Sequence, residues 1–340
     1  MMKRVLLGMS GGVDSSTAAY LLQEEGYEVV GVTMSLFLKE GDTSVEDAKK
    51  VCESLGIEHH VVSYYDAFKK HVIDNFIHCY QNALTPNPCI ECNKYLKFGL
   101  LWEKAQELNC EYIATGHYAA IRDGKLCRVP SVKDQSYFLY KIDKNILNHI
   151  LFPLSAYEDK ERIREIAASK GLNTAHKKDS QDICFIENGA YTRFLEENME
   201  NLPDKGDFVL KTGEVLGKHK GLFYYTIGQR KGLGIRYDHP LYVVAIDKEN
   251  NQIVLGKEED LFSTTIEITD VNLLVDTLPK EAQGKIRYKY QPVDCLVEVL
   301  DEKNWKVVFR EPVKSATPGQ ALVLYDGDVC LGGGTIRKFY

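Results

Sequence analysis

The feature that most constrains the fold is a glycine-rich turn between a short apolar strand and a helix. The strand is expected at 4–8 and the helix at 15–25, and the turn reads Gly8-Met9-Ser10-Gly11-Gly12-Val13-Asp14-Ser15. Further strands are expected at 27–34, 58–63 and 111–115, with helices at 44–55, 67–82, 92–108 and 158–170. This alternation is typical of a parallel sheet with helices on its faces.

The pattern changes after about residue 200, where short apolar strands alternate with turn dipeptides such as Thr212-Gly213 and Asp326-Gly327. Such spacing is typical of small sheets and barrels. The sequence therefore predicts an α/β protein in three parts. These are a Rossmann-like parallel-sheet domain (1–198), a small mixed or β connecting domain (199–257) and a C-terminal β-barrel (258–340).

Charge and apolar runs exclude several classes of protein. The 340 residues carry 42 Lys and Arg against 49 Asp and Glu, and the net charge of −7 argues against nonspecific polyanion binding by bulk charge. One stretch, 205–236, is locally basic, with seven Lys and Arg against two Asp and Glu. The longest apolar run, 29–38, is too short for a membrane-spanning helix of roughly 20 residues. We expect no contact with a membrane and a cytoplasmic location.

The glycine-rich turn predicts an anion site. Its backbone N–H groups can point to one centre, and the helix that follows adds the positive end of its dipole, so a phosphate is the expected ligand. The turn lacks the Gly-Lys-Ser/Thr of a Walker A loop and the G-x-G-x-x-G of a dinucleotide fold. It resembles the pyrophosphatase-type loop of enzymes that cleave ATP between the α and β phosphates. That resemblance implies Ser10 and Ser15 on the pyrophosphate and Asp14 near Mg2+.

Two residues at the carboxyl ends of other strands are expected to line the adenine and the ribose, because open α/β sheets bind ligands at that edge. They are Met34 and Gly116. The expected ATP-binding residues are therefore Gly8, Met9, Ser10, Gly11, Gly12, Val13, Asp14, Ser15, Met34 and Gly116.

Three of the nine cysteines differ from the rest. Cys89 and Cys92 form a C-x-x-C pair at a helix start, after two prolines that hold the approach extended. We expect the helix dipole, with Lys94 and Lys97, to stabilise a Cys92 thiolate as a nucleophile. Cys184 lies where a polar segment becomes apolar. The other six are expected to be reduced thiols that pack in the core, because the odd total of nine cysteines does not suit a disulfide framework.

Several strings resemble the bacterial tRNA-specific 2-thiouridylase family over essentially the whole chain. They are Ser-Gly-Gly-Val-Asp-Ser-Ser (10–16), Thr-Pro-Asn-Pro (85–88), Cys-Asn-Lys (92–94), Ala-Thr-Gly-His-Tyr (114–118), Lys-Asp-Gln-Ser-Tyr-Phe-Leu (133–139), Ile-Cys-Phe-Ile (183–186), Thr-Ile-Gly-Gln-Arg-Lys-Gly-Leu-Gly (226–234), Pro-Gly-Gln (318–320) and Cys-Leu-Gly-Gly-Gly (330–334). The resemblance implies ATP-dependent 2-thiolation of the wobble uridine in tRNAs for Lys, Glu and Gln. In that reaction ATP adenylates the C2 oxygen, and AMP leaves as sulfur attacks.

The resemblance also implies how sulfur is carried. Cys184 would bear a persulfide and Cys92 would help to release the sulfur, leaving a transient disulfide between them. The commoner family pattern has Asp where this chain has Cys89. Three thiolates can hold a [4Fe–4S] cluster with one open iron, and we favour this cluster because a persulfide relay has no necessary role for a third thiolate. Both routes stay open, as does the sulfur donor, which is a protein or sulfide.

The same resemblance places a set of residues on the tRNA. Asn87, Pro88 and Cys89 are expected to contact the flipped uridine, with recognition assisted by His117 and Gln320. Further tRNA contacts are expected from Lys133, Asp134, Gln135, Arg287 and Tyr288. Basic residues interleaved with tyrosines suit phosphate contact and base stacking.

Two other functions fit parts of the sequence. A ligase with the same loop could adenylate a small carboxylate and release pyrophosphate, but it would have no need of the three cysteines. An RNA-binding or nucleotide-sensing protein could bind ATP without turnover. Pyrophosphate release that requires unmodified tRNA would argue against both.

Overall fold

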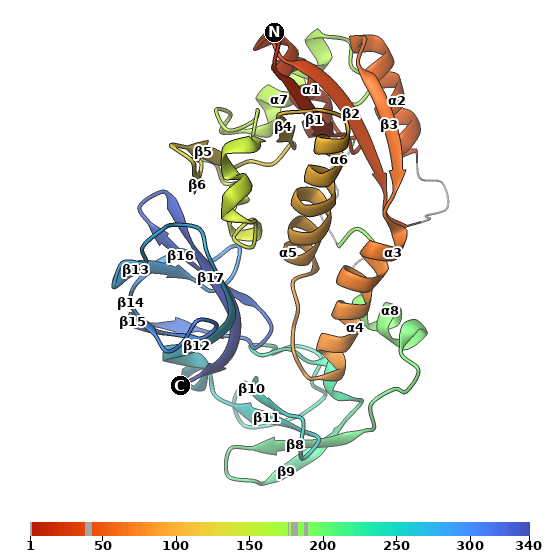
Figure 1. Ribbon diagram of the computed structural model, residues 1–340. Helices are drawn as coiled ribbons and strands as arrows, with labels where there is room; N and C mark the ends of the chain where they lie inside the picture. The colour runs from red at the N-terminus through yellow and green to blue at the C-terminus, as the bar shows by residue number, and fades with distance from the viewer. Residues whose placement is uncertain (1, 38–42, 176, 178–182, 187–189) are drawn as a thin grey trace.

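The computed structural model describes residues 2–37, 43–175, 177, 183–186 and 190–340 (Figure 1). The chain forms a parallel sheet with its helices, then a small sheet, and finally a barrel. In the view of Figure 1 the parallel sheet is at the top, the small sheet is at the bottom, and the barrel is at the lower left. Among the described residues no helix is long and apolar enough to cross a membrane.

The parallel sheet has five strands in the order β3-β2-β1-β4-β7. They are β1 (Arg4–Gly8), β2 (Glu28–Ser35), β3 (Glu58–Ser63), β4 (Tyr112–Ala114) and β7 (Ile150–Leu151). All four pairings are parallel. The central strand β1 is apolar throughout its middle, as a parallel strand buried on both faces must be. The predicted alternation of strands and helices is confirmed.

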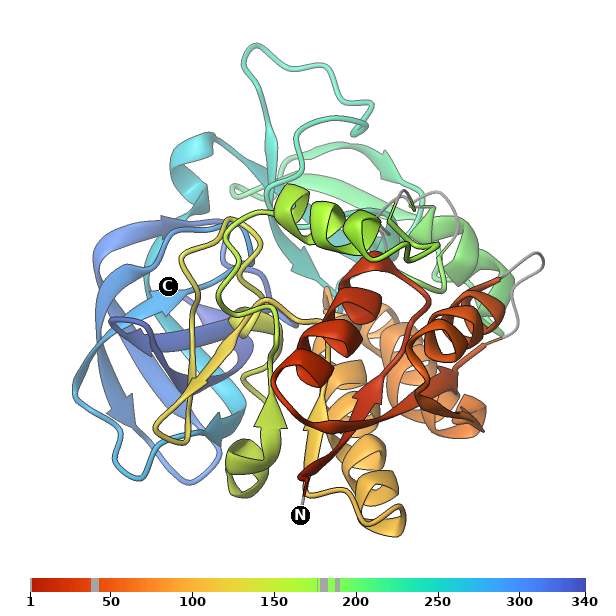
Figure 2. The ribbon, with the colours of Figure 1, turned by 90° about the horizontal axis from the view of Figure 1, so that it is seen from above.

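Helices cover both faces of this sheet, because successive residues of β1 point to opposite sides. Val5 and Leu7 pack in one core cluster with α1, α2 and α7, whereas Leu6 packs in a second cluster with α6. Figure 2 shows α1 and α6 on opposite sides of the sheet. These helices are α1 (Val13–Glu24), α2 (Ser44–Leu55), α6 (Leu101–Glu107) and α7 (Lys160–Ser169).

Two helical columns extend from the carboxyl edge of the sheet (Figure 1). The first consists of α3 (Tyr65–Phe68), the π-helical segment η1 (Lys69–Ile73) and α4 (Asp74–Gln81). The second consists of α5 (Pro88–Cys92), the π-helical segment η2 (Asn93–Leu100) and α6. Both columns were expected as plain helices, so the π-helical segments, with their i→i+5 hydrogen bonds, are a difference from the prediction.

The small sheet follows helix α8 (Tyr191–Asn198) and has the strand order β10-β11-β8-β9. Its strands are β8 (Gly206–Leu210), β9 (Val215–His219), β10 (Tyr242–Asp247) and β11 (Gln252–Gly256). The β11–β8 pair is parallel and the other two pairs are antiparallel, so the sheet is mixed, as predicted.

The C-terminal strands close into a six-stranded barrel, because β12 pairs with both β15 and β17. The strands are β12 (Phe262–Leu273), β13 (Glu281–Lys285), β14 (Val293–Val299), β15 (Trp305–Lys314), β16 (Ala321–Asp326) and β17 (Val329–Phe339). Closure removes the unpaired edges that an open sheet would expose. The predicted fold class, including the barrel, is confirmed.

A hairpin from the first part of the chain joins the barrel sheet. It consists of β5 (Ala120–Arg122) and β6 (Lys125–Cys127), whose turn at Asp123-Gly124 was predicted. Cys127 pairs with Val329 of β17, an attachment that the sequence did not predict. The remaining short 3₁₀ helices are η3 (Ser136–Phe138), η4 (Lys144–His149), η6 (Leu222–Tyr224) and η7 (Glu258–Leu261).

Candidate active site

A cavity of about 460 Å³ lies at the carboxyl edge of the parallel sheet. The ends of β1, β2 and β4 form one side of it, and α5 with η2 forms another. Nine of its lining residues were expected to bind ATP or to handle sulfur: Gly8, Met9, Ser10, Asp14, Ser15, Met34, Gly116, Cys92 and Cys184. Four more were expected at the target base or on the tRNA: Pro88, Cys89, His117 and Gln135. The structure therefore brings the loop and all three cysteines to one cavity.

The glycine-rich turn is shaped by close backbone contacts. Gly11 has a φ of +65°, and a Cβ there would lie 2.3 Å from the carbonyl oxygen of Ser44, so only glycine fits. The backbone N–H of Ser10 donates to the Ser15 hydroxyl over 3.2 Å, and the two hydroxyls lie 3.1 Å apart. Gly11, Gly12 and Val13 were expected to bind ATP but do not line the cavity, and Val13 is buried in the core.

Gly116 lets β4 approach the start of α1. A Cβ at this position would lie 3.0 Å from both the carbonyl carbon of Asp14 and the nitrogen of Ser15. Met34, near the end of β2, lines the same cavity. Both residues thus lie where a nucleoside next to the loop would be expected.

The carboxylate of Asp14 already has two partners. Its Oδ2 accepts from Lys160 Nζ over 2.7 Å, and its Oδ1 accepts from the Tyr118 hydroxyl over 3.0 Å. A metal ion on Asp14 would have to bind beside the ammonium of Lys160 or exchange with it. Lys177 donates to the Gly11 carbonyl over 3.0 Å and to Asp47 over 2.8 Å. Sequence reasoning missed both lysines, although Lys177 lies in the polar segment before Cys184.

The three cysteines reach the cavity from two segments. Cys89 and Cys92 come from α5, whereas Cys184 is held by its neighbour Phe185, whose ring lies 5.7 Å from Phe68 and 5.4 Å from Phe76. Cys92 is buried. Cys89 and Cys184 have exposed surface, yet the protein around the cavity still desolvates their thiols enough to raise the pKa of both. The segment 178–182 before Cys184 lies outside the described residues. The aromatic anchor explains how an apolar run after Cys184 brings this thiol to the site.

The predicted lowering of the Cys92 pKa is wrong. Burial raises the pKa of Cys92 and of Cys89, and it raises the pKa of Cys184 to about 12. Charge on Cys92 and on Cys89 raises the pKa of Cys184 further, and charge on Cys89 raises the pKa of Cys92. Cys92 is the last residue of α5, beyond the first turn in which a helix dipole acts most strongly.

Lys97 is the only Lys or Arg among the described residues that line this cavity. In an α-helix, side chains five residues apart point in directions about 140° apart around the axis, so Lys97 and Cys92 would lie on different faces. The π-helical segment η2 widens the turn and brings residues i and i+5 closer to one face. The charge of Lys97 lowers the pKa of all three thiols, against the effect of burial. Lys94 instead lies over the ring of Tyr95, at 4.9 Å.

Two further cavity residues have defined partners. His117 is buried, and its Nδ1 lies 2.8 Å from the hydroxyl of Thr115. Burial, followed by the charge of Lys97, lowers the pKa of His117 well below its usual value. Gln135 Oε1 accepts from the backbone N–H of Tyr118 over 3.0 Å.

The remaining tRNA-contact predictions lie away from the cavity lining. Gln320 donates to the carbonyls of Thr85 and Pro86, next to Asn87, which lines a second cavity. Arg287 donates to the carbonyl of Ser315 and to the hydroxyl of Thr317, both over 2.8 Å.

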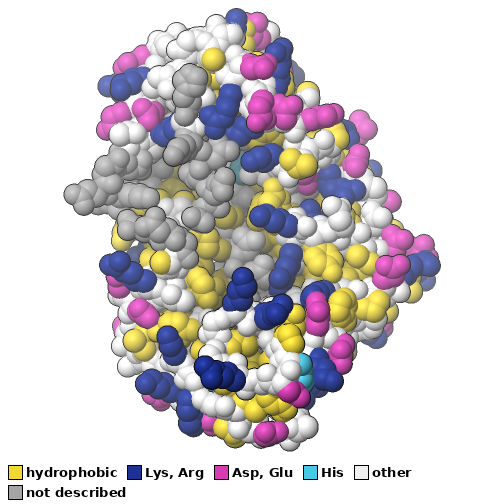
Figure 3. Space-filling view, turned by 180° about the vertical axis from the view of Figure 1, so that it is seen from behind, with side chains coloured by type: hydrophobic (Ala, Val, Ile, Leu, Met, Phe, Trp, Pro, Cys, Tyr) yellow, Lys and Arg dark blue, Asp and Glu magenta, His cyan; other side chains and the backbone are white. Residues whose placement is uncertain are grey.

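The other three residues expected on the tRNA, Lys133, Asp134 and Tyr288, differ in their exposure to solvent. Lys133 is exposed. Asp134 is buried and accepts from the Ser136 hydroxyl over 2.8 Å, and Tyr288 packs on Phe138 with ring centroids 4.6 Å apart. In the space-filling view from behind, a row of Lys and Arg side chains runs down the middle of this face of the molecule (Figure 3).

The described residues contain no group of three or more His, Cys, Asp or Glu side chains that could hold a metal ion. The three thiols share a cavity but do not form such a group. The geometry therefore does not support the predicted iron–sulfur cluster.

Three family models match the chain in succession. They are described as the tRNA methyl transferase HUP domain (3–188), the tRNA methyl transferase PRC-barrel domain (192–257) and the aminomethyltransferase beta-barrel domain (263–336). A solved 4-thiouridine synthetase–RNA complex with bound ATP covers 57% of this chain and 50% of its own, at 19% identity and a TM-score of 0.37. That score is too low to support a conclusion.

Relatives match over the full length. The tRNA-specific 2-thiouridylase MnmA of Clostridioides difficile (strain 630) is 45% identical over 358 residues, which cover 99% of each chain. The protein of the same name from Clostridium acetobutylicum is 46% identical over 357 residues, which cover 99% of this chain and 100% of the relative. On this identity and coverage, the chain belongs to the tRNA-specific 2-thiouridylase family.

Proposed function

We propose that this protein uses ATP to replace the C2 oxygen of the wobble uridine of tRNA with sulfur. One observation carries the proposal: the glycine-rich turn and three thiols open into the same cavity. An activated base and a sulfur carrier can therefore meet there without diffusing apart. The alternative of a small-molecule ligase is not favoured, because the full-length relatives are thiouridylases.

The first half of the proposed reaction activates the base. The C2 oxygen attacks the α-phosphorus of ATP, pyrophosphate leaves, the N3 proton is released, and the base becomes O-adenylated. Backbone N–H groups of the turn, with the hydroxyls of Ser10 and Ser15, are proposed to bind the pyrophosphate. Asp14, whose carboxylate also accepts from Lys160, is the residue proposed to hold Mg2+, which would supply charge neutralisation of the phosphates.

The second half replaces the oxygen. The outer sulfur of a Cys184 persulfide attacks C2, and AMP leaves with the former oxygen. The Cys92 thiolate then attacks Cys184 Sγ, which breaks the S–S bond to the base. 2-Thiouridine is released, and a Cys92–Cys184 disulfide remains for a cellular thiol to reduce. The shared cavity and the effect of Cys92 on the pKa of Cys184 support this pairing.

We further propose that the substrates are tRNAs for Lys, Glu and Gln in the cytoplasm, with a persulfide-bearing protein or sulfide as donor. Asn87, Pro88 and Cys89 are proposed to contact the target base, because Pro88 and Cys89 begin α5 and line the cavity, and Asn87 directly precedes them. A wobble base is already in a loop, and single-stranded bases are what RNA-binding sites usually read.

Nucleoside mass spectrometry tests the proposal. Unmodified tRNA incubated with ATP, Mg2+ and a sulfur source should gain 2-thiouridine, and Cys184→Ala and Cys92→Ala should each abolish the product. Because activation precedes sulfur attack, Cys184→Ala should keep tRNA-dependent pyrophosphate release. Cys79→Ala is the matched control, since Cys79 lies outside this cavity. Pyrophosphate release that is independent of tRNA would contradict the proposal.

The same assay tests the route of sulfur. Anaerobically purified protein that lacks labile iron should still thiolate tRNA from a persulfide donor, and chelation of Mg2+ should stop pyrophosphate release. Activity that appears only after iron and sulfide are added would instead support the cluster predicted from Cys89, Cys92 and Cys184. Cys89→Asp separates the routes, because it removes one cluster thiolate and leaves the proposed relay pair intact.

A further inference from the structure

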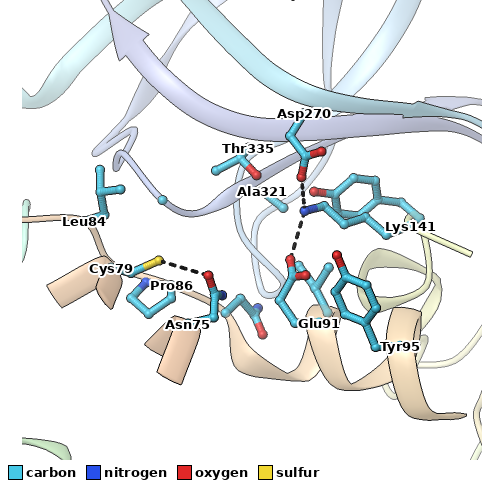
Figure 4. A pocket seen from close by; sticks show the side chains of 14 residues that line it. Asn75, Cys79, Leu84, Pro86, Glu91, Tyr95, Lys141, Asp270, Ala321 and Thr335 are labelled. Carbon is cyan, nitrogen blue, oxygen red and sulfur yellow. Dashed lines mark hydrogen bonds and ion pairs between the residues drawn. The ribbon is translucent and has the colours of Figure 1, made fainter. Parts of the chain in front are cut away.

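A buried ammonium connects the barrel to the helix that bears two of the thiols (Figure 4). Lys141 Nζ donates to Glu91 Oε1 over 2.9 Å and to Asp270 Oδ2 over 2.5 Å. Only 5% of the Lys141 side chain is exposed, against 17% for Glu91 and 62% for Asp270. Glu91 belongs to α5 and Asp270 to β12, so one side chain joins two parts of the fold.

The segment that carries Lys141 is itself held between the same two parts. On the barrel side, Asn272 donates to the carbonyls of Tyr140 and Ile142 over 2.7 and 2.9 Å. On the helix side, Asn93 donates to the carbonyl of Phe138 over 3.0 Å. The ion pairs of Lys141 thus lie within a continuous set of contacts from β12 to α5 and η2.

Glu91 lies on a different face of α5 from the two cysteines. Cys89 and Cys92 are three residues apart and share one face of the helix, whereas Glu91 is turned about 100° from Cys92 and about 200° from Cys89. Accordingly, the two cysteines line the candidate active site, while Glu91 and Lys141 line a separate cavity of about 260 Å³. The contact that Lys141 makes with Glu91 therefore fixes the rotation of α5, and with it the direction in which Cys89 and Cys92 face.

Lys141 keeps its charge in this buried position. Burial opposes the ammonium, but the charge of Glu91 and the hydrogen bonds to Asp270 and Glu91 raise the pKa of Lys141. Removal of Lys141 alone would leave the Glu91 carboxylate buried without a partner, which is strongly destabilising in general.

We propose that Lys141 is a positioning residue for sulfur transfer, and that it acts by fixing Glu91, and with it α5, to the barrel strand β12. Without this link α5 loses its ion-pair connection to β12 and shifts, and Cys89 and Cys92 lose their fixed placement in the cavity. The inference rests on the proposed function for its kinetic consequence, but the placement of Cys92 can be measured separately.

The experiment compares Lys141→Met with the double variant Glu91→Gln/Lys141→Met. The single variant should have a lower melting temperature, because it leaves the buried Glu91 carboxylate without its positively charged partner. The double variant removes that charge and should melt near the wild-type temperature, yet it still lacks the link. Its kcat for 2-thiouridine formation should be about a hundredfold lower, as expected for a small misplacement of reacting groups. Its KM for ATP should stay unchanged.

Lys144→Met is the matched control. Lys144 lies on the same segment and pairs with Asp276 over 3.5 Å, but both side chains are well exposed, so its removal should leave kcat and stability unchanged.

Iodoacetamide labelling of Cys92, followed by mass spectrometry, gives a readout that does not depend on activity. Cys92 is buried in the wild type and should label slowly, whereas it should label at least about tenfold faster in the double variant. A double variant that regains wild-type kcat together with its stability would overturn the proposal, as would unchanged labelling of Cys92. Absence of 2-thiouridine in the wild type would refute the proposed function, and the labelling result would still decide the role of Lys141.

Discussion

At the scale of single residues, the site places three thiols where burial opposes their ionisation. Sulfur chemistry requires the thiolate, yet burial raises the pKa of Cys89, Cys92 and Cys184. Lys97 is the one cation among the described cavity residues that acts against this effect. Its charge is therefore the feature of the site on which reactivity near neutral pH should depend most.

We predict that Lys97→Met moves the acidic limb of the pH–rate profile for thiolation to higher pH. Loss of the positive charge raises the thiol pKa values further, so fewer thiolates exist at neutral pH, and activity returns as the pH rises. At a pH below the pKa, raising the pKa by about one reduces the thiolate population about tenfold. Lys94→Met is the control, because Lys94 lies over Tyr95 and lines a different cavity. A profile that falls equally at all pH values would contradict this role.

The sequence contained the residues of this site but not their geometry. The sequence shows the C-x-x-C pair, Lys97 and the apolar run after Cys184, and the family resemblance implies how the cysteines work together. The π-helical segment that brings Lys97 toward Cys92 has no signature in the hydrophobic pattern. Desolvation of Cys92 likewise depends on packing from distant residues, which is why the direction of its pKa change was predicted wrongly.

At the scale of elements, a barrel loop fixes the approach to α5. Thr85 N–H donates to the carbonyl of Pro318 over 2.9 Å, and Gln320 donates to the carbonyl of Thr85 over 2.8 Å. Between them, Gly319 has a φ of +91°, and a Cβ there would lie 2.8 Å from the nitrogen of Thr85. The turn that precedes the thiols therefore depends on a glycine more than 200 residues later.

We predict that Gly319→Ala impairs thiolation more than its loss of stability explains. Gly327→Ala is the matched control: Gly327 also has a positive φ, +53°, but a Cβ there would meet nothing within 4 Å. Both variants should lose about 1–2 kcal/mol from the left-handed conformation. Only Gly319→Ala should also displace Thr85 and lower kcat, as measured by thermal unfolding and single-turnover thiolation. Equal kcat values in the two variants would show that the loop contact is not required.

Local sequence patterns predict the individual strands and helices, but they do not predict which distant strands pair. Apolar β1 and the helices around it follow from local patterns, and so does the turn at Asp123-Gly124. That the β5–β6 hairpin pairs with β17 depends on residues about 200 positions apart, Cys127 and Val329, and no local pattern encodes such a partner. The core shared by Tyr137 and Tyr325 arises in the same way.

At the scale of the whole molecule, the net negative charge of the protein opposes binding of its negatively charged substrate, tRNA. The net charge of −7 repels tRNA in bulk, so binding must rely on local basic surface. Within the basic stretch 205–236, Lys211 and Lys218 are paired with Asp260 and Asp207. Lys231 and Arg236 are exposed, and no ion pair is found for either among the described residues, which leaves them available for phosphates.

We predict that Lys231→Ser/Arg236→Ser weakens tRNA binding and flattens its salt dependence. Each phosphate that is no longer neutralised by a side chain should reduce the slope of log affinity against log salt by about 0.7–0.9, so the double variant should reduce it by roughly one to two. Titration of tRNA at several salt concentrations measures this slope. Lys49→Ser/Lys50→Ser on α2, at the opposite end of the molecule from the small sheet, is the control and should leave the slope unchanged (Figure 1). An equal change in both variants would mean that tRNA senses only net charge, and that the basic stretch is not a binding surface.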